Sequence, residues 1–307
     1  MQGVLSAGAR MRAAQGSADV RRTDVASGYG APKCAGGDMR TAVKLIAEHT
    51  YMLTDRLTGV NQFLLEGKEK ALLIDTGYGT KSLPRVVEKL TSLPVMVVNT
   101  HLHPDHSNGN GFFGKVMVGE PDLPSHGVPS NYIFEGVASA YRKSLLRPLM
   151  SVARKFALID PSSAEYSPMP DMIHLGDRSL DAVLCPGHTA GSVIFCDSET
   201  DYIFAGDAIN REQWMFTCPS SRAKDYAELW KDMQEGLSCW SKIWISHSRK
   251  PLDIDFIGEF IRALETIKPE NGRPTKIKGT PEPVTIYACE SEKYGRGRVW
   301  AYPSQVR

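Results

Sequence analysis

Five short apolar runs in this sequence each end at a histidine or an aspartate, and this pattern limits the chain to folds in which several strands finish at one place. The runs are typical of buried strands, because they hold almost only apolar residues over four or five positions. The residues at their ends are Asp75, His101, His188, Asp207 and His247. Polar residues often terminate single strands. Five such ends together indicate a site along one edge of a sheet, where loops diverge around a pocket.

The densest group of polar residues follows the apolar run over 95–99 and reads Thr100-His101-Leu102-His103-Pro104-Asp105-His106. In an extended stretch alternate side chains share a face, so His101 and His103 point the same way. Asp105 and His106 come next in the turn, which can direct them at a second point nearby. Imidazoles and carboxylates are ligands of zinc and related transition metals. Packing alone does not explain this group, since each buried polar side chain would need a partner. The segment therefore predicts a metal site.

From Met39 onward the chain alternates strands with helices, which predicts sheets covered by helices. Strands are expected at 43–47, 60–65, 71–75, 95–99, 182–185, 192–196, 202–205, 243–246, 284–289 and 298–302. Helices are expected at 83–90, 224–236 and 253–268, with one or two more within 131–157.

Residues 1–38 differ from the rest, because they are rich in Ala, Gly, Ser and Arg and show no periodicity. They are expected to form a disordered leader, with an organellar transit peptide as the alternative. Residues 39–307 are expected to form one domain, with a helical insertion at about 120–177 and a C-terminal strand pair.

The amino-acid composition argues against some classes of binding partner. The 36 Lys and Arg residues against 35 Asp and Glu residues give a net charge of +1, which argues against a nucleic-acid partner. No apolar run approaches the roughly 20 residues of a membrane span. The six cysteines are scattered and read as reduced thiols, which favours a cytoplasmic protein. A small-molecule substrate is the expected partner, and a homo-oligomer is left open.

The ordered set of strand-end residues resembles the metallo-β-lactamase superfamily. The similarity runs from about Met39 to Lys268, and residues 185–192, CPGHTAGS, are very similar to the third motif of that family. The resemblance implies a four-layer αβ/βα sandwich with a binuclear metal centre at one edge. It implies two zinc ions, with iron or manganese as alternatives. The implied ligands are His101, His103 and His188 for the first ion, Asp105, His106 and His247 for the second, Asp207 between the two, and Asp75 as a supporting residue.

Two divalent ions about 3.5–4 Å apart can share a hydroxide and stabilise charge that develops on substrate oxygens. Asp105 is expected to act beside that hydroxide, holding it and helping to transfer its proton. The true β-lactamases of the superfamily mostly lack a bridging aspartate. Asp207 therefore points to the glyoxalase II-like, lactonase-like and thioesterase-like branches, and we expect a metal-dependent hydrolase of an ester, thioester or lactone.

Two other activities use the same scaffold. One is a phosphodiesterase or nuclease with the same two metals, and the other is a mononuclear iron persulfide dioxygenase. For the substrate pocket, Trp214 and Phe216 are candidates because they follow Asp207 closely, and Tyr132 is a candidate within the insertion. Apolar walls beside a metal would select a substrate with an acyl or aryl group.

Overall fold

The computed structural model describes residues 40–126, 163–218, 221–277, 280 and 282–306. The expected leader over 1–38, the helices expected within 131–157 and Tyr132 lie outside these residues. Within the described part of the chain, no helix is both long enough and apolar enough to cross a lipid bilayer.

One sheet contains seven strands in the order β1-β2-β3-β4-β5-β6-β7. They are β1 (Thr41–Ala47), β2 (Thr50–Asp55), β3 (Asn61–Glu66), β4 (Ala71–Ile74), β5 (Val95–Val98), β6 (Lys115–Val118) and β7 (Glu165–Pro168). The strands β1 to β4 form an antiparallel meander, whereas β4 to β7 run parallel. The parallel part brings the ends of β4 and β5 to the same edge.

The second sheet contains six strands in the order β14-β13-β11-β10-β9-β8. They are β8 (Met172–His174), β9 (Ser179–Leu184), β10 (Val193–Asp197), β11 (Tyr202–Gly206), β13 (Lys242–Ile245) and β14 (Leu252–Asp253). Only β11 and β13 are parallel neighbours, and the helix α6 (Ala223–Leu237) lies between them in the chain. Their ends therefore also meet at one edge.

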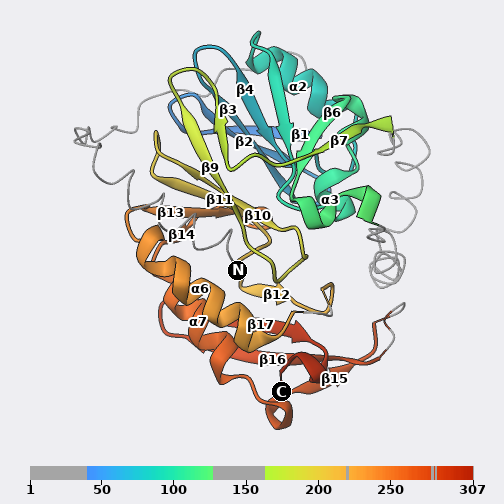
Figure 1. Ribbon diagram of the computed structural model, residues 1–307, viewed down its shortest axis with the longest axis vertical. Helices are drawn as coiled ribbons and strands as arrows, with labels where there is room; N and C mark the ends of the chain where they lie inside the picture. The colour runs from blue at the N-terminus through green and yellow to red at the C-terminus, as the bar shows by residue number, and fades with distance from the viewer. Residues whose placement is uncertain (1–39, 127–162, 219–220, 278–279, 281, 307) are drawn as a thin grey trace.

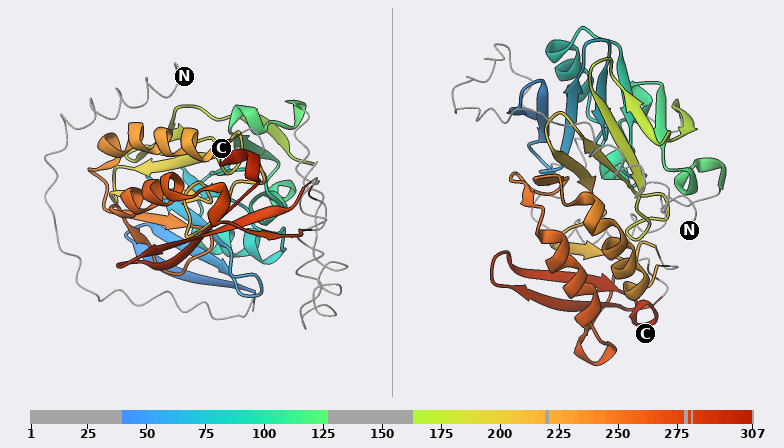
Figure 2. Two further views of the ribbon diagram at one scale, coloured as in Figure 1. Left: turned by 90° about the horizontal axis from the view of Figure 1, so that it is seen from below. Right: turned by 60° about the vertical axis from the view of Figure 1, so that its left-hand side comes forward.

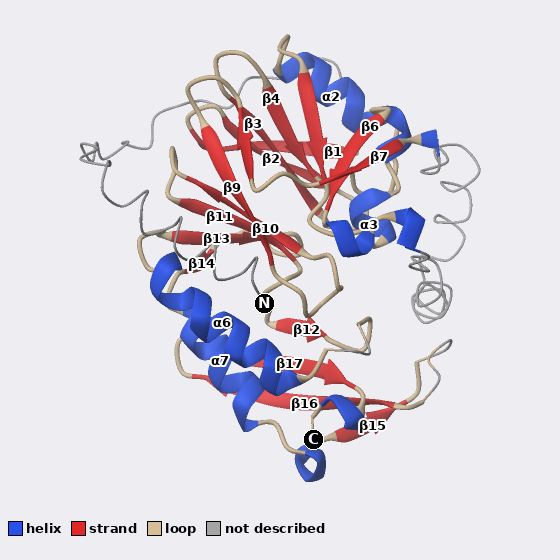
Figure 3. Ribbon diagram, in the orientation of Figure 1, coloured by secondary structure: helices blue, strands red, loops and turns tan. Residues whose placement is uncertain are grey.

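The two sheets pack face to face, with helices outside them (Figure 1). Between the sheets, the ring of Phe63 lies 4.9 Å from that of Phe204 and 6.0 Å from that of Trp244. The helix α2 (Ser82–Leu90) buries Leu83, Val86 and Val87 in the core on the outer face of the seven-stranded sheet. This order of helix, sheet, sheet and helix, visible in Figure 3, is the four-layer αβ/βα sandwich expected from the sequence.

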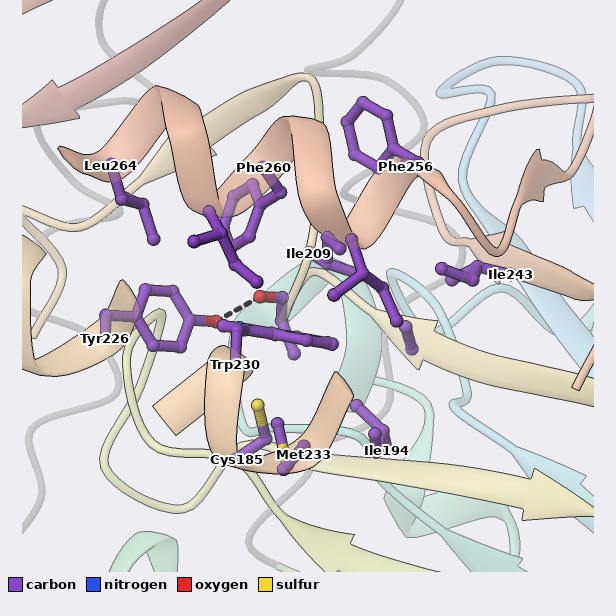
Figure 4. Packing of buried hydrophobic residues seen from close by; sticks show 14 of the residues in the cluster. Cys185, Ile194, Ile209, Tyr226, Trp230, Met233, Ile243, Phe256, Phe260 and Leu264 are labelled. Atoms are coloured by element: carbon purple, nitrogen blue, oxygen red, sulfur yellow. Dashed lines mark hydrogen bonds between the residues drawn. The ribbon is translucent and has the colours of Figure 1, made fainter. Parts of the chain in front are cut away.

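The outer face of the second sheet is covered by α6 and α7 (Phe256–Thr266). Apolar side chains three or four residues apart form one stripe on each helix. At their contact, the ring of Phe260 lies 5.7 Å from that of Tyr226 and 5.8 Å from that of Trp230 (Figure 4). The Tyr226 hydroxyl donates a hydrogen bond to the carbonyl of Ala208. This contact ties the helix layer to the loop after β11, where Asp207 lies.

A third, four-stranded sheet lies beyond the helix layer (Figure 2). Its order is β12-β17-β16-β15, with β12 (Glu212–Trp214), β15 (Arg273–Thr275), β16 (Val284–Ser291) and β17 (Gly295–Ala301). Side chains of β16 and β17 share the core of α6 and α7, among them Tyr287 and Val299. The C-terminal strand pair expected from the sequence is thus part of a larger sheet, because β12 pairs with β17.

A buried ion pair joins the two main sheets. Arg178, just before β9, contacts Asp197 through two atom pairs, Nε to Oδ1 at 3.0 Å and Nη2 to Oδ2 at 2.5 Å. The same guanidinium donates to the carbonyls of His49 and Glu66 in the seven-stranded sheet, each at 3.3 Å. Both side chains are almost fully buried, and the loss of either one would leave the other without its partner in the core.

The expected insertion over 120–177 differs from the structure in its described residues. These residues hold short turns at Glu120–Asp122 and Pro124–His126, followed by the strands β7 and β8. Because β7 joins the first sheet and β8 the second, both belong to the sandwich itself. The strands β2 and β6 were also not predicted.

Candidate metal centre

The parallel pair of β4 and β5 places Asp75 beside Thr100. The Asp75 carboxylate accepts hydrogen bonds from the Thr100 backbone N–H and from the Thr100 hydroxyl, both at 2.8 Å. Asp75 also lies 2.8 Å from Nδ1 of His106, and its backbone has a φ of +64°. This carboxylate therefore organises the turn that follows β5, as expected of a supporting residue.

The two pairs of polar residues after β5 differ in backbone conformation. His101 lies in the extended segment, and His103 is the N-cap of the one-turn helix α3 (Pro104–Ser107) with an extended φ of −66° and ψ of 148°. Pro104 occupies the first turn, where its missing N–H costs nothing. Asp105 and His106 lie within α3. This change from extended to helical backbone directs the two pairs at two different points, as the sequence predicts.

The second sheet supplies three more residues from the same edge. His188 lies in the turn between β9 and β10, Asp207 directly follows β11, and His247 follows β13. Because β11 and β13 are parallel neighbours, Oδ2 of Asp207 lies 3.0 Å from Nε2 of His247. The seven side chains named as ligands thus come together from both sheets.

Three histidines form the first group. Nδ1 of His103 lies 2.9 Å from Nε2 of His101 and 2.9 Å from Nε2 of His188. A ring nitrogen offers one in-plane lone pair or one hydrogen, so Nδ1 of His103 cannot bond well to both neighbours. Nitrogens around one tetrahedral zinc ion lie about 3.3 Å apart, given zinc–nitrogen bonds of about 2.0–2.1 Å. The convergence of these three nitrogens therefore fits a metal ion better than a hydrogen-bond network.

Asp105, His106 and His247 form the second group, with ligand atoms within 4.8 Å of one another. Oδ2 of Asp105 lies 3.4 Å from Nε2 of His247 and 3.7 Å from Nε2 of His106. Oδ2 of Asp207 lies 3.6 Å from Nε2 of His106. It also lies 3.9 Å from Nε2 of His188, a member of the first group. Asp207 stands between the two groups, at the position that bridging two ions would require.

Three buried polar atoms at this place have no hydrogen-bond partner among the described residues. They are Oδ1 of Asp105, Nε2 of His106 and Oδ1 of Asp207. Buried polar atoms are costly without a partner, so their presence together needs an explanation. Each is a metal-ligand atom by chemistry, and Nε2 of His106 is directed inward because Nδ1 faces Asp75. The donor set fits divalent metal ions.

Burial sets the protonation of the first group. It lowers the pKa of His103 to about 3, with His188 adding to the effect. Burial also lowers the pKa of His188, and it lowers that of His101 well below its ordinary value. These rings are therefore neutral at pH 7, which is the form that binds metal.

The second group carries opposite charges. Burial alone would lower the pKa of His247, but the carboxylates of Asp207 and Asp105 raise it to about 10. Burial alone would raise the pKa of Asp207, but His247 and His106 lower it well below its ordinary value. The His247 side chain is 37% exposed, so its proton can leave to solvent when a metal binds.

Neighbouring groups fix the orientation of two of the histidines. Nδ1 of His188 lies 2.7 Å from the carbonyl oxygen of Trp214. Nδ1 of His101 lies 3.1 Å from the hydroxyl of Thr100. A hydrogen bond to one ring nitrogen selects the tautomer and leaves the other nitrogen for the metal. The sequence does not indicate this role for Thr100 or Trp214, because a threonine and a backbone carbonyl carry no distinctive signal.

The three candidates for substrate contact have different outcomes. Trp214 is half-buried at the end of β12, and its ring lies 5.4 Å from that of Phe216 and 6.2 Å from that of Trp300. Phe216 has no exposed surface, because it packs with Val284 in a core of the third sheet. The expectation that Phe216 contacts substrate was wrong for this reason. Tyr132 lies outside the described residues.

Comparison with known proteins agrees with this geometry. Residues 55–235 match the model of the metallo-beta-lactamase superfamily. Acyl-coenzyme A thioesterase MBLAC2 of Homo sapiens is 30% identical over 180 residues, which cover 54% of this chain and 64% of that protein. The protein of the same name from Gallus gallus is 30% identical over 177 residues, covering 54% and 63%. The chain thus matches less than two thirds of the length of these relatives.

Two solved structures show the same fold. A metallo-beta-lactamase from Pontibacter korlensis has a TM-score of 0.52 at 16% identity, covering 74% of this chain and 100% of that one. A metallo-beta-lactamase family protein from Thermus thermophilus has a TM-score of 0.52 at 20% identity, covering 76% and 86%. The predicted four-layer sandwich is confirmed.

Proposed function

Since this chain belongs to the metallo-beta-lactamase superfamily, we propose that it is a metal-dependent hydrolase that cleaves thioesters of the acyl-coenzyme A class. The main support is the position of Asp207, whose Oδ2 lies 3.0 Å from Nε2 of His247 and 3.9 Å from Nε2 of His188. One carboxylate between two groups of ligands is what a binuclear centre requires. The printed names of the relatives at 30% identity support the thioester as the bond that is cleaved.

All seven side chains of the proposed centre would hold the ions, and one of them, Asp105, would also handle a proton. His101, His103 and His188 would hold one ion, Asp105, His106 and His247 the other, and Asp207 would contact both. Two such divalent ions, with zinc as the first choice, would supply a hydroxide nucleophile at neutral pH and polarise the substrate carbonyl.

Asp105 is proposed to orient the attacking water and to accept its proton. Its Oδ1 atom is buried and has no hydrogen-bond partner among the described residues, so one oxygen of this carboxylate is free to do so. Burial would raise the pKa of Asp105, but His106 and His247 lower it, so the carboxylate is ionised at pH 7. An ionised carboxylate can take up the proton and pass it to the leaving thiolate.

Trp214 is proposed as one wall for the acyl group. Its carbonyl contacts His188, so this residue lies at the rim of the first group of ligands, and its half-buried ring presents an apolar face. An apolar wall at this place would favour an acyl chain over a highly charged group.

Thiol release from a series of acyl-coenzyme A esters, followed with a thiol reagent, tests the proposal. We expect hydrolysis that disappears when a chelator removes the metal and returns when zinc is added. His101→Ala should abolish it. His174→Ala is the matched control, since His174 is an exposed histidine on β8, away from the ligands.

Three other substrates decide between this activity and its alternatives. A panel of bis(p-nitrophenyl) phosphate, a lactone and a persulfide is assayed with the same protein. Preferential cleavage of the phosphodiester would indicate a nuclease or phosphodiesterase. Oxygen uptake with the persulfide in an iron-loaded protein would indicate a dioxygenase. Either result, without thioester hydrolysis, would overturn the proposal.

A further inference from the structure

Asp122 is a buried carboxylate close to the three-histidine group that the reaction itself does not use. It belongs to the short turn Glu120–Asp122 after β6 and is 1% exposed. Its Oδ2 accepts a hydrogen bond from the hydroxyl of Thr189 at 2.7 Å, and its Oδ1 accepts one from the backbone N–H of Gly191 at 2.7 Å. Burial raises the pKa of this carboxyl, and its contacts with Thr189, Gly191 and the backbone of Leu102 oppose that shift.

The residues that contact Asp122 lie next to the three histidines. Leu102 is the residue between His101 and His103, and Thr189 directly follows His188. The first segment extends from the seven-stranded sheet, and the second is the turn between β9 and β10 in the other sheet. One carboxylate thus lies against both segments that carry the histidines, and it is hydrogen-bonded to the second of them.

The hydrogen bonds around Thr189 leave its hydroxyl with one direction in which to donate. The Thr189 N–H donates to Oγ of Ser192 at 3.0 Å. The two hydroxyls lie 2.8 Å apart, and the carboxylate of Asp122 can only accept while it is ionised. The Ser192 hydroxyl therefore donates to Thr189, and the Thr189 hydroxyl donates to Asp122. Each donor in this series of hydrogen bonds has an acceptor only while Asp122 accepts from Thr189.

Two glycines let the segments approach closely enough for these bonds. A Cβ at Gly119 would lie 2.0 Å from the carbonyl oxygen of Gly191, and a Cβ at Gly191 would lie 2.6 Å from Cβ of Asp122. Any side chain at either position would push the turn of His188 away from the turn of Asp122.

We propose that Asp122 is a positioning residue that holds His188 at the correct distance from His101 and His103, and thereby sets the affinity of the three-histidine group for metal. The inference rests on the proposed metal centre. It assigns to Asp122 no contact with substrate or metal. Its effect passes through its hydrogen bonds to Thr189 and Gly191, which hold the turn of His188 against the segment of His101 and His103. Groups that orient metal ligands typically change metal affinity by about 10- to 100-fold.

Zinc titration of metal-free protein against a chromophoric chelator tests this role. In Asp122→Asn the amide cannot accept from both Thr189 and Gly191, because its NH₂ group faces one of them. We expect one of the two zinc equivalents to bind about 10- to 100-fold more weakly and the other to bind as in the wild type. The visible spectrum of the cobalt-loaded variant should also differ, because it reports ligand geometry. The variant should fold, since the Thr100 carbonyl still accepts the Val193 N–H at 2.8 Å across the same two segments.

A second pair of variants covers the case in which Asp122→Asn does not fold. Thr189→Val removes one donor to the carboxylate, and Thr189→Ser keeps the hydroxyl. We expect weaker zinc binding in the first and rescue in the second. Asp197→Asn is the matched control, because Asp197 is another buried carboxylate but pairs with Arg178. It should lower the melting temperature of the metal-free protein without changing zinc affinity.

If Asp122→Asn kept wild-type zinc affinity and an unchanged cobalt spectrum, even with a lower melting temperature, this inference would be overturned. The proposed metal centre would not be affected. Equal zinc affinities of Thr189→Val and Thr189→Ser would also overturn this inference. A wild-type protein that binds no divalent metal would instead overturn the proposed metal centre, and this inference with it.

Discussion

Oδ2 of Asp75 lies 2.8 Å from Nδ1 of His106, and both side chains are fully buried. This contact determines which nitrogen of His106 is available. Because Nδ1 donates its hydrogen to the carboxylate, Nε2 is the nitrogen that points toward Asp105 and Asp207, where it has no hydrogen-bond partner among the described residues. A residue outside the candidate ligand set thus determines which ring nitrogen of His106 faces the other ligands.

Asp75→Asn is therefore expected to weaken the second metal position. The carboxylate accepts two hydrogen bonds from Thr100 and one from His106, and an amide would direct its NH₂ group at one of these donors. We expect zinc affinity there to fall about 10- to 100-fold, measured by chelator competition. Asp177→Asn, at an exposed turn, is the control. An Asp75 variant that retains full affinity at both positions would contradict the role given to this residue.

The convergence of the seven candidate ligands could be predicted from the sequence because its signal is local. Each candidate ligand follows an apolar run within a few residues or lies within the six residues from His101 to His106, and both patterns are visible without knowledge of strand order. The partition into two groups also follows locally, since Pro104 starts a helical turn after an extended segment.

The features that sequence analysis missed depend on pairing between distant segments. Phe216 is buried because β12 pairs with β17, which lies more than 80 residues further along the chain. No local sequence pattern indicates this pairing. Asp122 meets partners from two other segments and carries no motif of its own. β7, whose sequence is EYSP, contains a proline and lies at the edge of its sheet, so it lacks the apolar alternation that indicates a strand.

Asp207→Asn is expected to cost the protein its second metal ion and most of its activity. The wild type, with seven ligand side chains, should hold about two zinc ions per chain after reconstitution. A neutral amide cannot balance two divalent ions, and one of its two terminal atoms is a donor rather than a ligand. We expect elemental analysis to show clearly fewer than two ions in the variant, with kcat lower by orders of magnitude. Asp201→Asn, at the exposed turn between β10 and β11, provides the control. A variant that kept both ions and most of its rate would show that Asp207 is not a bridging ligand.

Trp214→Ala is expected to raise KM for long acyl chains while metal content stays unchanged. The contact to His188 is made by the Trp214 carbonyl, which the substitution keeps, so only the ring is lost. Each methylene removed from apolar contact costs about 0.8 kcal/mol, so the effect should grow with chain length. The measurement is KM across an acyl-coenzyme A series for the wild type, Trp214→Ala and Trp214→Phe, in which Phe retains an apolar ring. If Trp214→Ala left KM unchanged across the series, or if the variant lost zinc, the ring of Trp214 would not be a wall of the acyl site.

The metal-free protein is expected to lose stability as the pH falls from about 6.5 toward 4. Burial lowers the pKa of His103 to about 3 and also lowers those of His101 and His188, whereas the same rings titrate near 6.5 in the unfolded chain. Between these values the unfolded state binds protons that the folded state does not, so stability decreases as pH decreases. A histidine that stays neutral in the folded state while it is protonated in the unfolded state contributes about 1.4 kcal/mol per pH unit.

The other titrating groups of the site do not reverse the direction in which stability changes with pH. The pKa of His247 is raised to about 10 and that of His106 well above its ordinary value, so both rings are protonated in both states well below pH 6.5 and contribute no slope there. The lowered pKa of Asp207 matters only near and below the usual range of a carboxyl group, at about 3.9. Urea unfolding in the presence of a chelator, repeated from pH 7.5 to 4.5, measures the slope. His103→Gln should flatten it, because glutamine takes up no proton in either state. A free energy of unfolding that stayed constant between pH 6.5 and 4.5 would show that these three rings are not held neutral in the folded protein.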